Sequence, residues 1–148
     1  MTDDQVEVAL LTQYFYPDIP GTAQITTDLA LGLKDSGFKV TAYTGWPAYT
    51  EKARSRSREV YNGIRIRRAY SRLLSRDGFR RRLLNWGTVA AITLVNLLRY
   101  RKPDVILVDS TSPLLLMVAW FFGVVWRVPY VCLVQDVYPD IAIQLGVI

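Results

Sequence analysis

Two short segments that lie far apart in the sequence are almost entirely apolar: Val6–Thr12 (VEVALLT) and Asp104–Asp109 (DVILVD). Neither alternates polar and apolar residues, as a strand with one face in water would. Continuous apolar runs of this length are typical of strands that are covered by helices on both faces. The sequence therefore predicts an α/β domain in which these two segments are the central strands of a sheet.

The rest of the chain alternates between strand and helix patterns. Further strands are expected at Phe38–Tyr43, at Ile64–Ala69 after the Asn62-Gly63 turn, and at Pro129–Gln135. Helices are expected from Gly21 to Gly37, from Phe79 to Tyr100, from Ser112-Pro113 onward, and from Pro139. This alternation predicts a doubly wound parallel sheet with right-handed crossovers. The loops after Thr12, Tyr43, Asp109 and Gln135 should then share the ligand-binding edge.

The apolar residues of one helix and of the last strand allow two further expectations. Ile25, Leu29 and Leu33 have the spacing of one helix face. Cys132 lies in an apolar run, so we expect a small buried side chain. As the only cysteine, it has no partner for an internal disulfide, which fits a reducing cytoplasm.

The size and composition limit the possible classes of function. A chain of 148 residues and 16.9 kDa is long enough for one domain. It contains no histidine, which excludes histidine-based catalysis within the chain. Met1–Glu7 has no pattern of a secretory signal. The apolar run Ser112–Trp126 falls short of the roughly 20 residues that span a bilayer, so we expect a buried or interfacial helix.

The positive charge is concentrated in the middle of the chain. All 18 Lys and Arg residues except Lys34, Lys39 and Arg127 lie between positions 51 and 102. Arg80, Arg81 and Arg82 open an apolar helix there. Basic residues beside an apolar helix face favour contact with an anionic membrane surface. An ordinary solvated face is the main alternative, and nucleic acid is disfavoured because the companions are aliphatic rather than stacking aromatics.

Small and hydroxylated residues at the expected edge are candidates for ligand binding. Gly21 and Thr22 open the first helix, where free N–H groups can hold a phosphate. Ser110 and Thr111 follow a central strand and suit sugar hydroxyls or phosphate oxygens, although a tight turn and capping by Ser112 explain the same residues. No G-x-G-x-x-G is present, so a dinucleotide site is disfavoured.

Further candidates are one carboxylate and several aromatic residues. Asp136 follows the last strand and either orients an acceptor hydroxyl or caps the next helix. Tyr16 and Trp46, with Tyr14 and Tyr49, either stack on sugar rings or pack their own loops down. No metal-ligand motif and no cofactor motif is found, so we expect neither.

Several segments together resemble the N-terminal domain of family 4 glycosyltransferases, in particular bacterial enzymes that build colanic acid, capsule or O-antigen. The segments that carry the resemblance are 13–49 (QYFYPDIPGTAQITTDLALGLKDSGFKVTAYTGWPAY), 61–70 (YNGIRIRRAY), 104–113 (DVILVDSTSP) and 135–148 (QDVYPDIAIQLGVI). The family often has paired glycines where this chain has Gly21-Thr22, and often an acceptor-side histidine, which this chain lacks.

The resemblance implies a Rossmann-like, acceptor-side domain of a two-domain GT-B enzyme. Such an enzyme transfers a sugar from a nucleotide-sugar donor, with retention of anomeric configuration and no essential metal, to a sugar on a polyprenyl diphosphate. Asp136 is then a catalytic candidate, and the protein is expected in the cytoplasm at the inner face of the cell membrane.

The resemblance also implies which part of a glycosyltransferase the chain represents. Residues 1–148 correspond to the N-terminal domain, without the C-terminal domain that holds most of the donor, so we expect a piece of a longer protein that is inactive alone. Two alternatives are a separate acceptor-binding subunit and a non-catalytic α/β module that recruits a partner to anionic lipid or nucleic acid. The donor sugar, acceptor sugar, linkage and oligomeric state cannot be read from the sequence.

Overall fold

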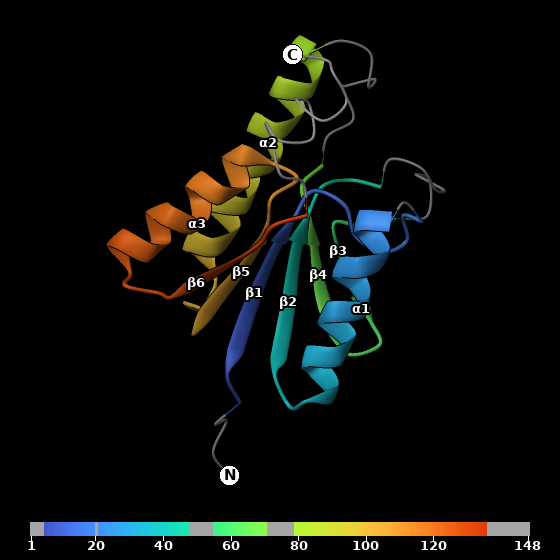
Figure 1. The fold of residues 1–148 in the computed structure, drawn as a ribbon, viewed down its shortest axis with the longest axis vertical. Helices are drawn as coiled ribbons and strands as arrows, with labels where there is room; N and C mark the ends of the chain where they lie inside the picture. The colour runs from blue at the N-terminus through green and yellow to red at the C-terminus, as the bar shows by residue number, and fades with distance from the viewer. Residues whose placement is uncertain (1–4, 20, 48–54, 71–78, 136–148) are drawn as a thin grey trace.

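The computed structural model describes residues 5–19, 21–47, 55–70 and 79–135, which form one six-stranded sheet with helices on both faces (Figure 1). The strand order is β3-β4-β2-β1-β5-β6. The strands are β1 (Glu7–Thr12), β2 (Lys39–Thr44), β3 (Arg58–Tyr61), β4 (Ile64–Arg68), β5 (Val105–Asp109) and β6 (Tyr130–Leu133). The prediction that β1 and β5 are central and that the fold is a Rossmann-like α/β domain is confirmed.

In the described part of the chain three helices cover the sheet: α1 (Gly21–Asp35), α2 (Phe79–Arg99) and α3 (Pro113–Val125). The helix expected from Pro139 lies outside the described residues. Successive β1 residues point to opposite faces, so Val8 and Leu10 pack in a cluster with Ala30 of α1. Ala9 and Leu11 pack instead in a cluster with residues of α2 and α3. This two-sided burial explains why the β1 sequence is apolar without alternation.

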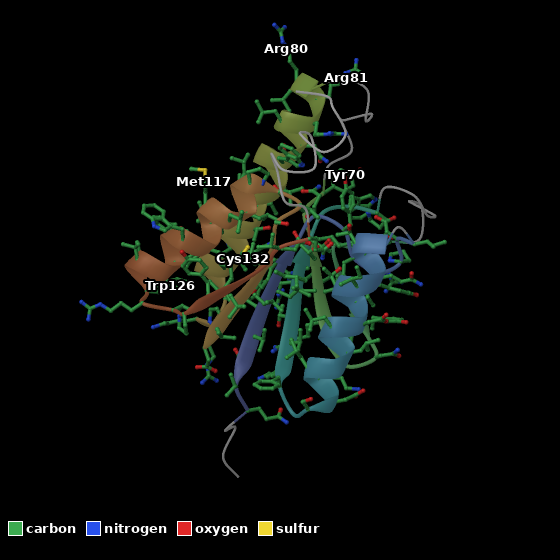
Figure 2. The ribbon with its side chains drawn as sticks, viewed as in Figure 1. Tyr70, Arg80, Arg81, Met117, Trp126 and Cys132 are labelled. Carbon is green, nitrogen blue, oxygen red and sulfur yellow. The ribbon has the colours of Figure 1, made fainter. Side chains whose placement is uncertain are left out.

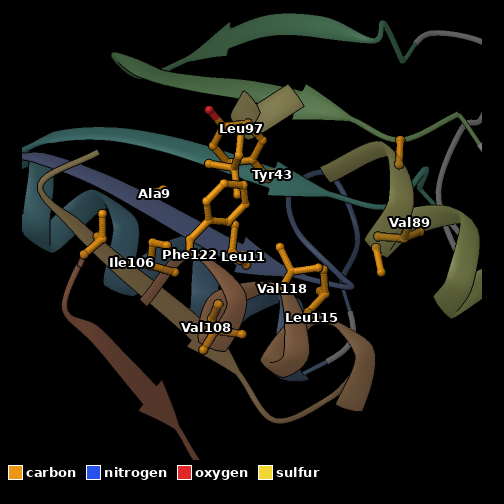
Figure 3. Close-up of a cluster of buried hydrophobic side chains, with 14 residues drawn as sticks. Ala9, Leu11, Tyr43, Val89, Leu97, Ile106, Val108, Leu115, Val118 and Phe122 are labelled. Carbon is orange, nitrogen blue, oxygen red and sulfur yellow. The ribbon is translucent and has the colours of Figure 1, made fainter. Parts of the chain in front are cut away.

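The larger core cluster lies between the sheet and the pair α2 and α3 (Figure 3). Leu97 of α2 and Leu115 and Phe122 of α3 are fully buried against the sheet. No helix in the described segments is both long and apolar enough to cross a bilayer. The run Ser112–Trp126 thus forms a helix that is buried on one side, as predicted.

The sheet contains one antiparallel strand that the sequence prediction missed. β3 pairs with β4 in antiparallel register, Tyr61 opposite Ile64, while every other pairing in the described sheet is parallel. Asn62 and Gly63 connect the two strands with positive φ angles of 46° and 87°. Left-handed backbone at both central residues is characteristic of a tight two-residue hairpin turn. The sheet is therefore mostly rather than wholly parallel.

The buried face of α1 differs from the prediction. Its fully buried residues are Ala23, Thr26 and Ala30, whereas Ile25 is 53% exposed. Small side chains bring this helix close to the sheet, and the Thr26 hydroxyl is satisfied because it donates to backbone carbonyls, including that of Thr22 at 2.9 Å. The face marked by the spacing of Ile25, Leu29 and Leu33 is thus not the one that is fully buried.

The predicted end of α1 is confirmed. Gly37 has a φ of 94°, and the Phe38 backbone N–H donates to the Leu33 carbonyl at 3.1 Å. A glycine in left-handed conformation just after a helix allows such closing hydrogen bonds. The chain then enters β2 directly.

The prediction that Cys132 is a core residue is wrong, because its side chain is exposed. β6 is an edge strand of the described sheet and pairs only with β5. α3 reaches it near Gly123, where an added Cβ would lie 2.9 Å from the Tyr130 ring. The rest of β6 is left largely uncovered among the described residues.

Candidate functional site at the carboxyl edge of the sheet

The carboxyl ends of the parallel strands meet at one edge of the sheet, where the arrowheads converge in Figure 1. β1 ends there at Thr12, β2 at Thr44 and β5 at Asp109. The Gln135 backbone N–H also reaches this edge and donates to Ser110 Oγ at 2.9 Å. The strand ends at these positions therefore gather at one edge as predicted, while the loop after Gln135 lies outside the described residues. The edge of a doubly wound sheet is the usual place for ligands in such folds.

Asp109 holds the centre of this edge together. Its carboxylate is completely buried and accepts a hydrogen bond from the Thr12 hydroxyl across the β1–β5 pair. The other carboxylate oxygen accepts from the Thr111 hydroxyl and from the Thr111 backbone N–H at 3.2 Å. Charged acceptors form stronger hydrogen bonds than neutral ones, so this arrangement fixes the loop after β5 on the end of β1.

The predicted hydroxyl donors at positions 110 and 111 are both engaged inside the protein. Ser110 links the ends of β5 and β6, because its backbone N–H also donates to the Leu133 carbonyl at 3.0 Å. Ser112 stands at the N-cap of α3, but its side chain makes no capping hydrogen bond, and its buried Oγ has no partner among the described residues. The alternative that Ser112 caps this helix through its side chain is therefore wrong.

The start of α1 lies open at this edge. Gly21 is exposed and an added Cβ would meet nothing within 4 Å, so the glycine is not needed to avoid a clash with the protein. Thr22 is half-buried, and its carbonyl accepts from Thr26. The first turn of α1 contains no acidic residue, so no side chain of that turn repels an anion from the positive helix end.

Three aromatic candidates are described: the Tyr14 backbone carbonyl accepts from the Thr26 hydroxyl at 3.1 Å, and the rings of Tyr16 and Trp46 behave differently. The Tyr16 ring stacks on Tyr61 with a centroid distance of 3.7 Å, so one of its faces is already covered. Trp46 is half-buried and meets the exposed Tyr70 edge-on at 4.9 Å. The structure thus leaves Trp46 and Tyr70 as an aromatic pair at this edge, and Figure 2 labels Tyr70 there. Asp136 and Tyr49 lie outside the described residues.

The sequence reading missed Gln13 and Gly45. Gln13 is only 3% exposed, and its Oε1 has no hydrogen-bond partner within the described segments. An added Cβ on Gly45 would lie 2.9 Å from the Gln13 carbonyl oxygen, so this position requires glycine. A glycine directly after the predicted second strand was the only signal for this close approach. An unpaired buried amide oxygen at a ligand edge offers an acceptor for a substrate hydroxyl.

Arg68 at the end of β4 is the third missed residue. It is 3% exposed, and Nη2 donates to the Tyr16 carbonyl at 2.7 Å and to Glu59 Oε1 at 2.6 Å. In the alternating burial pattern of β4, Arg68 shares the buried face with Ile64 and Ile66, although arginine is seldom buried. The carboxylate and the carbonyl satisfy Nη2 alone, because Nε and Nη1 have no partner among the described residues.

The surroundings of β4 are electropositive. Burial raises the pKa of Tyr43 above its ordinary value, while the neighbouring charges of Arg67 and Arg65 act to lower it. The Arg67 guanidinium lies 3.4 Å from the centroid of the Tyr100 ring. Within the segments that the structure describes, no group of three or more His, Cys, Asp or Glu side chains is arranged to hold a metal ion.

The fold and the edge site define a Rossmann-like α/β domain with a polar ligand edge. Residues 20–146 match the family described as glycosyl transferase 4-like domain, which covers most of the chain. The chain therefore belongs to this family of glycosyltransferase domains. No curated protein matches the chain.

Proposed function

We propose that this chain is the N-terminal, acceptor-side domain of a GT-B glycosyltransferase that transfers a sugar from a nucleotide-sugar donor to a lipid-linked saccharide in surface polysaccharide biosynthesis, with retention of configuration. The observation that carries the proposal is the glycosyl transferase 4-like match over residues 20–146. The open carboxyl edge, with Gln13, Trp46 and the start of α1, supplies acceptors, a stacking surface and N–H donors suited to a sugar.

In this proposal the domain forms one wall of a cleft. A bond forms between an acceptor hydroxyl oxygen and the anomeric carbon, and the bond from that carbon to the donor phosphate breaks on the same face. The hydroxyl proton passes to the departing phosphate oxygen. Helix N–H groups and arginines that face the phosphate stabilise its developing charge. Asp136, Gly21, Thr22, Ser110 and Thr111 remain candidates for contact with substrate.

Transfer is tested with the intact protein, a panel of nucleotide sugars and a polyprenyl-diphosphate-linked sugar. We expect a glycosylated lipid with one donor, and NMR of the new linkage should show the donor's anomeric configuration. The matched sample is the 148-residue chain alone, which we expect to give no turnover. An inverted linkage would contradict retention, and the absence of transfer with every donor would contradict the activity.

The acceptor assigned here requires a membrane, and one end of the molecule suits an anionic surface. Arg80 and Arg81 project from the end of α2 that extends past the strand tips (Figure 2). Leu83 and Leu84 are exposed one turn further along. The outer face of α3 is also apolar and exposed: Met117, Trp120, Phe121, Val124 and Val125. Adjacent basic and apolar groups of this kind support peripheral binding at the inner face of the cell membrane.

Liposome sedimentation measures this contact. Each basic group near an anionic surface contributes about 1 kcal/mol. Replacing both Arg80 and Arg81 by Gln should therefore weaken binding to anionic vesicles by about 30-fold, since 1.4 kcal/mol is tenfold. Lys34→Gln with Lys39→Gln removes the same charge elsewhere and should have little effect. Equal binding of both double variants, or equal binding to neutral vesicles, would contradict the membrane contact.

A further inference from the structure

A cavity beside the edge site, sharing Arg68 and Tyr70 with it, lies between the β3–β4 hairpin and α2. It has a volume of about 210 Å³. Its lining residues are Ser57, Arg58, Arg67, Arg68, Tyr70, Ile92 and Asn96. Three of the seven carry a guanidinium group, and none carries a carboxylate.

The charges around this cavity are not balanced. Glu59 pairs with Arg68 at 2.6 Å and so neutralises one of the three arginines. Arg58 and Arg67 have no acidic partner among the described residues, and both guanidinium groups lie over the Tyr100 ring, at 5.7 Å and 3.4 Å from its centroid. Stacking on an aromatic ring orients an arginine without satisfying its N–H donors.

Several buried donors in this cluster have no partner. Arg67 Nε and Arg68 Nε and Nη1 are buried and make no hydrogen bond. The Arg68 side chain is completely buried, so its unpaired donors are closed to solvent and to a ligand alike, and a ligand in the cavity can reach only the exposed Arg58 and the half-buried Arg67. Unpaired buried positive charge is costly, so an anion in the cavity would stabilise this cluster through its charge.

We infer that this cavity is a phosphate-binding subsite for the acceptor of the proposed transfer reaction. A phosphate has oxygens in several directions and can accept from Arg58 and Arg67 at once, with Ser57 and Asn96 as neutral donors. The volume lies below the range of about 300–1,000 Å³ that holds a whole small-molecule ligand, so it suits a charged group rather than a nucleotide sugar. This assignment rests on the proposed function only for the identity of the molecule that carries the phosphate.

The position of the cavity links it to the edge site. Tyr70 lines the cavity and also contacts Trp46, which lies just beyond the end of β2. A phosphate held by Arg58 and Arg67 would therefore place its attached sugar toward the aromatic pair. This arrangement distinguishes acceptors that carry a phosphate from neutral saccharides.

Isothermal titration of the intact protein with inorganic phosphate and with pyrophosphate tests the subsite directly. We expect saturable binding that Arg67→Gln and Arg58→Gln each weaken about tenfold or more. Arg67→Lys keeps the charge and should retain part of the affinity. The matched control is Arg56→Gln, which removes the same charge from an exposed position outside the cavity and should change affinity by less than twofold.

Two further titrations identify the molecule that carries the phosphate. Farnesyl diphosphate represents a lipid-borne phosphate and glucose 6-phosphate a sugar-borne one. If either binds more tightly than inorganic phosphate, the result supports the subsite and shows which kind of molecule carries the phosphate. Glucuronate tests whether a carboxylate suffices. The proposal is overturned if glucuronate binds as tightly as phosphate or if phosphate binding does not saturate. It is also overturned if Arg56→Gln weakens phosphate binding as much as the cavity variants do.

The result is separable from the transfer assay. Arg68→Gln removes the ion-pair partner of Glu59, so this variant would test folding as much as phosphate binding. Arg58→Gln and Arg67→Gln are therefore the variants that decide whether the cavity binds phosphate. Phosphate binding without any sugar transfer would sustain the subsite and reject the proposed activity. Transfer to neutral and phosphorylated acceptors with the same KM, in both wild type and Arg67→Gln, would reject the subsite and sustain the activity.

Discussion

The hydrogen bond between Thr12 and Asp109 offers a quantitative test of how the ligand edge is built. Thr12→Val keeps the shape of the side chain but removes the hydroxyl that donates to the Asp109 carboxylate. Both side chains are completely buried, so water cannot replace the lost donor. The substitution leaves one oxygen of a buried carboxylate without this partner.

Hydrogen bonds to charged groups contribute about 1.5–3 kcal/mol. We therefore expect Thr12→Val to lower the free energy of unfolding by about 2 kcal/mol, a large share of the 5–15 kcal/mol of an ordinary domain. With a urea m-value of about 2 kcal/mol per molar, the unfolding midpoint should fall by about 1 M.

Urea unfolding followed by tryptophan fluorescence measures this change. The control is Thr41→Val on β2, a half-buried position whose hydroxyl makes no hydrogen bond to a described residue. It should shift the midpoint by less than 0.3 M, since such changes are usually within about 0.5 kcal/mol. If Thr12→Val and Thr41→Val unfold at the same urea concentration, the hydroxyl–carboxylate bond does not hold the edge together.

Two other predictions concern single residues. Gly45→Ala should lower the free energy of unfolding by about 1–3 kcal/mol, because the new Cβ would lie 2.9 Å from the Gln13 carbonyl oxygen. Gly87→Ala in α2 places its Cβ where nothing lies within 4 Å, so it should raise the free energy of unfolding by up to about 1 kcal/mol. Thermal unfolding compares the two variants, and equal shifts of their melting temperatures would contradict the close approach at Gly45. The pKa of Cys132 is raised by partial burial and by the negative charge of Asp109, so less thiolate is present near neutral pH. Its alkylation by iodoacetamide at pH 7.5 should be slower than that of an unstructured cysteine peptide and should accelerate at higher pH, and an equal or faster rate would refute this.

Continuous apolar runs made the centre of the fold predictable. β1 and β5 are buried on both faces, and a strand buried on both faces has a continuous apolar sequence. β3 was missed because its residues, REVY, alternate in exposure at the edge of the sheet and carry little apolar signal. Asn62-Gly63 was recognised as a turn, and a tight turn of this kind implies a strand on each side, so the hairpin was available to the sequence reading.

The site was only partly predictable, because its chemistry depends on distances that sequence spacing does not encode. The loops that share the edge followed from strand order. Three other features could not be predicted from strand order: the pairing of Thr12 with Asp109, the burial of Arg68 and the unpaired oxygen of Gln13. Each results from contact between segments that lie far apart in the chain. Cys132 was misplaced because an apolar run indicates a strand but not whether that strand lies at an edge.

The separation of the two central strands also governs how the chain can acquire its fold. The hydrogen bond from Thr12 to Asp109 and the one from the Glu7 backbone N–H to Asp104 each join residues 97 positions apart. At translation rates of about 5–20 residues per second, β1 waits about 5–20 s for its central neighbour to be synthesised. Throughout that interval an apolar strand has only β2 to pair with, and long-range pairing of this kind makes folding slow. Nascent chains arrested before residue 105 should therefore be the species most dependent on chaperones.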